Sequence, residues 1–123
     1  MTAEVVWKIV GNELIRQEIL TADKDLTLKN WRFTVPTTAD KNRVEFVQNK
    51  RVDIFTGDEG TLKISVKADW KYDIGILATG DSRLGKGVIR AIPLHQIVNA
   101  DLIQLKSRQA KSWQIELEVG SLN

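Results

Sequence analysis

Residues 61–79 read TLKISVKADWKYDIGILAT, and this stretch decides the fold class. Its even-numbered positions, from Leu62 to Ala78, are all apolar, and its odd-numbered positions are polar or glycine except for Leu77. Because side chains alternate across an extended strand, a period of two places one set on each face. The stretch exceeds the roughly 3–10 residues of a typical strand. It therefore predicts either one long bent strand or two successive strands, with the bend near Asp69 or between Asp73 and Gly75.

The flanking sequence predicts further strands. Residues 5–10 are apolar on both faces, which is typical of a buried strand. The pair Gly11-Asn12 favours a tight turn, so residues 13–20, whose spacing fits a strand or a helix, are interpreted as the second strand of a hairpin. Residues 43–47 and 51–55 predict another hairpin around the turn at 48–50, and residues 113–119 alternate as a last strand.

Two local patterns depart from simple alternation. Apolar positions move from even numbers at Leu26 and Leu28 to odd numbers at Trp31 and Phe33, which predicts a β-bulge at residues 30–31. The spacing of the apolar residues in 94–98 predicts one short helical turn. About ten extended segments remain, and crossover helices that would support a parallel sheet are missing. We therefore expect a single all-β domain over residues 1–123, an antiparallel β-sandwich or flattened β-barrel of about eight to ten strands with at most one or two short helices.

Composition narrows the function classes. The chain is 42% hydrophobic and 28% charged, which is typical of a globular domain, and its net charge of +2 neither requires nor excludes a nucleic-acid partner. It contains no cysteine, which excludes a disulfide framework, a thiolate metal site and a cysteine nucleophile, and which fits a reducing compartment. No run approaches the roughly 18 apolar residues of a membrane span, and the first residues lack a signal-peptide pattern. The expectation is a cytoplasmic protein.

A glycine-rich loop offers the most specific motif. Gly80, Gly85 and Lys86 match the beginning of a phosphate-binding P-loop. A P-loop then needs a hydroxyl residue and a helix, whereas here Gly87 is followed by a β-branched run that ends at Pro93. The segment is therefore interpreted as a hairpin loop. Because binding residues concentrate on loops, Arg83 and Lys86 are the first candidates for contact with a partner.

A second pattern is that of a metal-dependent nuclease. Asp53, Asp69 and Lys71 are the residue types that hold magnesium and assist an attacking water. The same residues are also expected by chance on the solvated face of a charged β-domain. His95 is the only histidine, so a histidine zinc cluster is excluded, and its position resembles an ordinary turn residue. We predict no catalytic, cofactor-binding or metal-binding residue.

The third pattern combines aromatic and basic residues. Trp7, Trp31 and Trp70 directly precede lysine or arginine, and Trp113 follows Lys111 by two residues. Such combinations occur on surfaces that bind single-stranded nucleic acid. Adjacent side chains of a strand point to opposite faces, however, so these tryptophans are interpreted as core residues, of which one could be an exposed platform for a sugar or base. The lysines of the organising stretch form a second candidate patch, or alternatively a guard against unwanted strand pairing: Lys63, Lys67 and Lys71.

These observations favour a non-enzymatic binding or assembly module without cofactors. It would act through loops and sheet surface on a protein partner or by self-association into a homo-oligomer. A nucleic-acid-binding β-domain and a carbohydrate-binding β-sandwich are the alternatives.

Overall fold

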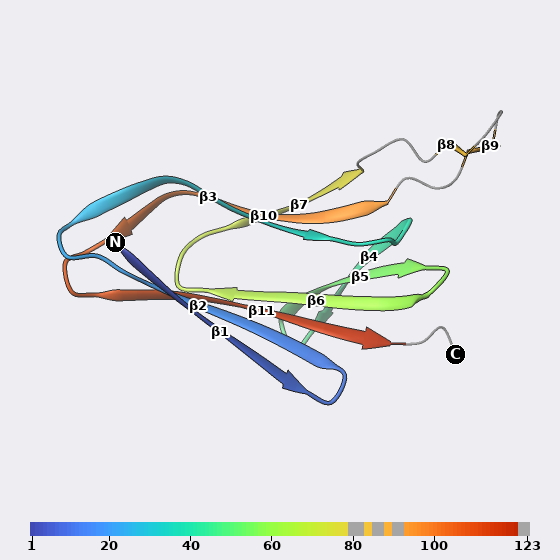
Figure 1. Ribbon diagram of the computed structural model, residues 1–123, viewed down its shortest axis with the longest axis horizontal. Helices are drawn as coiled ribbons and strands as arrows, with labels where there is room; N and C mark the ends of the chain where they lie inside the picture. The colour runs from blue at the N-terminus through green and yellow to red at the C-terminus, as the bar shows by residue number, and fades with distance from the viewer. Residues whose placement is uncertain (79–82, 85–87, 90–92, 121–123) are drawn as a thin grey trace.

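The computed structural model describes residues 1–78, 83–84, 88–89 and 93–120, in which every regular element is a β-strand (Figure 1). The strands are β1 (Thr2–Val10), β2 (Glu13–Thr21), β3 (Leu26–Pro36), β4 (Lys41–Val47), β5 (Lys50–Gly57), β6 (Gly60–Ala68), β7 (Asp73–Ala78), β8 (Arg83–Leu84), β9 (Val88–Ile89), β10 (Leu94–Leu105) and β11 (Ala110–Gly120). All pairings are antiparallel, which confirms the predicted fold class.

The strands form two layers of unequal width. In the described residues the large sheet has six strands in the order β1-β2-β11-β6-β5-β4, and the small sheet has three in the order β3-β10-β7. Figure 1 shows β3, β10 and β7 lying over β6, β11 and β2. The main hydrophobic core joins the layers, with Phe55, Ile64 and Trp113 from the large sheet and Val35 and Val98 from the small sheet. A smaller cluster joins them through Leu20 of β2 and Leu105 of β10. The architecture is therefore a sandwich, and the described strands of one sheet do not pair with those of the other.

The organising stretch forms two strands, one in each sheet. β6 ends at Ala68, residues 69–72 cross between the layers, and β7 begins at Asp73. Asp69 fixes this corner, because its backbone N–H donates to the Ser112 carbonyl at 3.0 Å and its carboxylate accepts from the Ser112 N–H and hydroxyl at 3.1 and 3.0 Å. The two-strand interpretation with a bend at Asp69 is confirmed. Val66 and Ile74 both contribute to the core, as the even-numbered alternation predicts.

Tight turns join several strands that are neighbours in the sequence. Gly11 has a φ of 60° in the two-residue turn between β1 and β2. Residues 13–20 pair with β1, so they form a strand rather than a helix. Gln48 and Asn49, at φ values of 52° and 65°, connect β4 to β5. Two successive positive φ values are typical of a type I′ turn, whose twist matches that of the flanking strands. Both predicted hairpins are confirmed.

The predicted bulge in β3 takes a different form. Lys29 and Asn30 are both exposed, so the inward side does change from even to odd positions as expected. The register with β10 is unchanged, however, because Leu28 pairs with Ile103 and Trp31 pairs with Ala100, which leaves two residues between these pairs on each strand. β10 changes sides at the same place, with Leu102 at a φ of 57°. A bulge in one strand alone would shift the register by one, so that part of the prediction is wrong.

The predicted helical turn at residues 94–98 is also wrong. These residues begin the 12-residue strand β10, and His95 lies within it rather than in a turn. Gln96 is completely buried, so the inward positions 96, 98 and 100 have the period of a strand. The sequence pattern was misleading because a buried glutamine does not count as an apolar position.

Candidate assembly surface at the edges of the large sheet

The small sheet is too narrow to cover the large one. Residues directly opposite in an antiparallel pair share a face, so the strand registers define one row across the inner face of the large sheet, from β1 to β4. The row consists of Ile9, Leu14, Leu117, Ile64, Asp53 and Val44. Ile64 and Asp53 are completely buried, whereas Ile9 is 79% exposed and Val44 is 41% exposed. The two outer strands therefore carry apolar side chains beyond the cover of the small sheet.

β1 is the longer of these two edge strands and the more apolar. Val5, Trp7 and Ile9 are exposed on its inner face, and Val10 is exposed on its outer face. The prediction that residues 5–10 form a buried strand is wrong, because among the described strands β1 lies at the end of the order and pairs only with β2. Its other side offers backbone N–H and C=O groups along nine residues that include neither proline nor glycine. Long, apolar edges of this kind are templates for pairing with another strand.

On the inner face of β1 and β2 the Arg16 guanidinium stacks on the rings of Trp7 and Trp113, an arrangement called the Arg16 stack. The Arg16 guanidinium lies 5.5 Å from the centroid of Trp7 and 4.9 Å from that of Trp113. Its Nη2 group is 3.3 Å from the Glu18 carboxylate, which also accepts a hydrogen bond of 2.8 Å from the Trp113 indole. Cations over aromatic faces are attracted by the ring quadrupole. The exposed Trp7 ring therefore packs against the Arg16 guanidinium, which also contacts the core residue Trp113.

The four tryptophans divide between core and surface. Trp113 is buried, and Trp31 and Trp70 pack against the same core, as predicted. Trp7 is 55% exposed and is the tryptophan for which the core interpretation is wrong. One feature of the sequence marks this difference, since Trp7 belongs to a segment that is apolar on both faces.

The predicted lysine row does not form a continuous patch. Lys63 and Lys67 are exposed on the outer face of β6, but Lys71 lies in the corner between the sheets. Lys63 pairs in register with Glu118, and the Lys50 ammonium is 3.2 Å from the Glu116 carboxylate. The hollow beside Lys63 has a volume of about 330 Å³ and is lined by four glutamates and two lysines. A polyanion would therefore meet a surface of mixed and mostly negative charge.

The residues of the nuclease pattern lie apart. Asp53 is buried under the small sheet, where it accepts two hydrogen bonds of 3.1 Å from Arg51 and one of 3.2 Å from the Gln96 amide. Asp53 pairs with Ile64, which lies five positions before Asp69, or about 16 Å along the strand direction at about 3.3 Å per residue. Within the described ranges, no group of three His, Cys, Asp or Glu residues could hold a metal ion. The structure does not bring Asp53 and Asp69 together.

The glycine-rich loop is described in part. The backbones of Arg83–Leu84 and Val88–Ile89 pair as strands β8 and β9, in agreement with a hairpin. Residues 79–82 and 85–87, Lys86 among them, lie outside the described residues, as do the contacts of the Arg83 side chain. The assignment of Arg83 and Lys86 as partner-binding residues stays a prediction.

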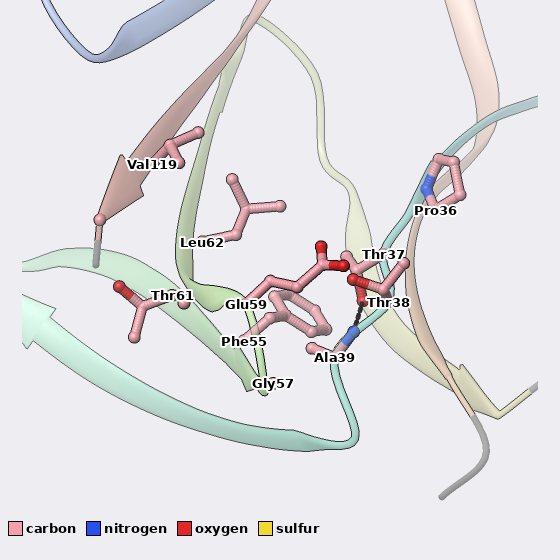
Figure 2. Close-up of a pocket in the computed structure, with 12 residues that line it drawn as sticks. Pro36, Thr37, Thr38, Ala39, Phe55, Gly57, Glu59, Thr61, Leu62 and Val119 are labelled. Carbon is pink, nitrogen blue, oxygen red and sulfur yellow. Dashed lines mark hydrogen bonds between the residues drawn. The ribbon is translucent and has the colours of Figure 1, made fainter. Parts of the chain in front are cut away.

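The sandwich also opens at one end into a hollow of about 480 Å³ (Figure 2). Phe55, Leu62, Val119 and Glu59 line it together with the loop that follows Pro36. The loop packs closely here, since a Cβ atom on Gly57 would lie 3.1 Å from the Ala39 Cα atom. Its described lining is mostly apolar, so this hollow is the open end of the hydrophobic core.

Comparisons with known proteins add no relative from which a function could be transferred. No family model, curated protein or solved structure matches the chain. Among the residues that the structure describes, no helix is long and apolar enough to cross a membrane. The exposed edge strands of the large sheet are therefore the features from which a function can be inferred.

Proposed function

We propose that this protein is a non-enzymatic assembly module that self-associates through β1. In this proposal the β1 strands of two copies pair antiparallel about a two-fold axis, which joins the two large sheets into one continuous sheet. The observation that supports it is the edge of β1, which is exposed, apolar and not paired with any other strand of the described residues. Two-fold contacts are the commonest in homo-oligomers, and they require a surface that is complementary to itself. We place this association in the cytoplasm, in keeping with the cysteine-free sequence.

The charges of β1 provide that self-complementarity. Glu4 and Lys8 are its charged side chains, and both are exposed on the outer face, two residues to either side of Val6. With Val6 on the two-fold axis, Glu4 of each copy lies opposite Lys8 of the other. The same register places Val5 opposite the partner's Trp7 on the inner face. Opposite charges and aromatic–aliphatic pairs directly across a strand pair are both stabilising.

The size of the contact sets the expected affinity. β1 has nine residues, fewer than the roughly 20–30 residues a side of a standard interface. We therefore expect a dissociation constant on the order of 10 μM, or about −7 kcal/mol.

Charge reversal tests the register. Glu4→Lys places two lysine pairs across the proposed interface and is expected to weaken the dimer by about 2 kcal/mol, which is about 30-fold in the dissociation constant. The measurement is sedimentation velocity over a range of protein concentrations. Adding Lys8→Glu to the same chain restores both opposite-charge pairs and is expected to restore the dimer. A wild-type chain that stays monomeric at 1 mM, or a double variant no tighter than Glu4→Lys, would contradict the proposal.

Single cysteines map the same contact independently of affinity. The natural chain has no cysteine, so Val6→Cys introduces one thiol per copy, and on the two-fold axis the two thiols meet. Cα atoms directly opposite in antiparallel strands lie about 4.5–5.5 Å apart, within the range that a disulfide spans. Mild oxidation is expected to cross-link Val6→Cys readily. Lys8→Cys is the matched control, because its partner position is Glu4 and its cross-linking is expected to be weak.

Two other functions predict different results in these experiments. A nucleic-acid binder would bind labelled single-stranded DNA with an affinity that falls steeply with salt, whether or not Glu4 is changed. A carbohydrate-binding module would quench Trp7 fluorescence on adding oligosaccharides, although Val5 and Ile9 give this tryptophan aliphatic neighbours. The proposal expects neither effect.

A further inference from the structure

The opposite edge of the large sheet has a second exposed apolar strand. β4 ends the order of the described strands, and within the part of the chain that the structure describes it pairs only with β5. Val44 and Phe46 are exposed on its inner face at 41% and 71%, and Val47 is exposed on its outer face. β4 contains neither proline nor glycine in its seven residues. The structure therefore leaves a second edge open to strand pairing.

The charges of β4 are also complementary to themselves. Arg43 and Glu45 lie one residue to either side of Val44, on the outer face of the sheet, and within one chain they form an exposed ion pair. When two β4 strands pair antiparallel with Val44 on the axis, Arg43 of each copy lies opposite Glu45 of the other. A register shifted to place Glu45 on the axis would instead oppose two carboxylates, which is unfavourable.

We infer that β4 is a second self-pairing edge and that its occupant is another copy of this chain. β1 and β4 lie at opposite ends of one sheet, so two-fold contacts at both edges would alternate without closing. The product is an open ribbon in which large sheets are joined β1 to β1 and β4 to β4. The β4 contact stands on its own charges and exposure, whereas the ribbon also rests on the proposed pairing through β1.

A head-to-tail contact between β1 and β4 is the competing arrangement. Its best register places Trp7 opposite Phe46 and Lys8 opposite Glu45, so it matches one charge pair where each two-fold contact matches two. This difference favours the two-fold contacts. The two arrangements respond differently to charge reversal, because the head-to-tail register places Glu45 opposite Lys8 but leaves Glu4 without a charged partner.

Four chains separate the arrangements: the wild type, Glu4→Lys, Glu45→Lys and the double variant. Sedimentation velocity is expected to show wild-type species larger than dimers that grow with concentration. Each single variant is expected to stop at dimers, with its blocked contact weakened about 10- to 100-fold, and the double variant is expected to be monomeric. Arg43→Glu added to Glu45→Lys restores both charge pairs and is expected to restore the ribbon. Thermal melting of each variant at low concentration checks that the fold is intact.

Cysteine mapping distinguishes failure of this inference from failure of the proposed function. In a Glu4→Lys chain, Val44→Cys is expected to cross-link to itself on oxidation, because the β4 contact does not depend on β1. If Val44→Cys stays uncross-linked while Val6→Cys cross-links in its own chain, the β4 contact is wrong and the β1 dimer stands. If Glu45→Lys is monomeric while Glu4→Lys associates like the wild type, and Val6→Cys cross-links to Val47→Cys in a mixture, the contact is head-to-tail and the two-fold ribbon is overturned.

Discussion

Replacing Trp113 with alanine is expected to lower the free energy of unfolding by about 3–5 kcal/mol, the usual effect of removing a large aromatic side chain from a core. Trp113 is 1% exposed and lies at the centre of the sandwich. Its ring contacts Trp31 and Phe33 of the small sheet, each at 4.8 Å between centroids. The substitution also removes the indole donor to Glu18 and one ring of the Arg16 stack. We therefore expect a loss of stability near the upper end of this range. Urea unfolding measures it, and a domain of this kind has about 5–15 kcal/mol in total.

Trp7 supplies the matched control for this prediction. Trp7→Ala removes an identical side chain from the same Arg16 stack, but from a position that is 55% exposed. We expect it to cost about 0.5–1 kcal/mol of stability in the monomer, in proportion to one exposed cation–π contact, while it weakens association through β1. Equal destabilisation by the two substitutions would mean that β1 is covered by the fold, and it would contradict both the assigned core and the proposed assembly surface.

The parts of the fold that the sequence predicts are those set by local alternation. β6, β7 and β11 follow from a period of two, because the parity of a residue within a strand determines its face whatever the neighbouring strand. The period of two also places Trp31, Trp70 and Trp113 on core-facing positions. The turn at Gly11 and the hairpin after β4 also follow from a few adjacent residues, since their backbone conformations depend on local steric preferences.

The position of each strand in the sheet does not follow from local sequence. β1 and the core strand β11 are both rich in large apolar residues, yet β1 lies at an edge and β11 between two neighbours. That difference depends on which distant segments pair. It also depends on the three described strands of the small sheet being too few to cover the six of the large sheet. The exposure of Trp7 and of Phe46 is a consequence of this mismatch in width, so the candidate assembly surface could be recognised only once the strand order was known.

Asp53 shows a different limit of sequence reasoning. As a residue type it fits a metal ligand on a solvated strand, whereas the structure buries it completely on the inner face of β5. Its neighbours explain why burial is tolerated. Arg51 donates to both of its carboxylate oxygens, and Gln96 donates to one of them from the small sheet. A carboxylate with this many charged and neutral donors is a structural link between the two layers.

Asp53→Ala is therefore expected to lower the free energy of unfolding by about 2–4 kcal/mol. Most of the loss arises at Gln96, which is completely buried and whose Oε1 atom has no hydrogen-bond partner among the described residues. Without the carboxylate, its amide nitrogen would lose its hydrogen bond as well. Arg51 contributes less, because its side chain is 38% exposed and its guanidinium can turn to water. Urea unfolding with the wild type as reference gives the value.

The double variant Arg51→Met, Asp53→Leu tests whether the pair acts through charge or through shape. Apolar residues of similar volume restore packing without a buried charge, and such replacements of ion pairs are often neutral or stabilising. We expect the double variant to recover about half of the stability lost in Asp53→Ala, and adding Gln96→Met, which removes the remaining buried amide, to recover the rest. If Asp53→Ala alone were as stable as the wild type, the carboxylate would not link the layers, and its burial would have to serve a role other than packing the two sheets together.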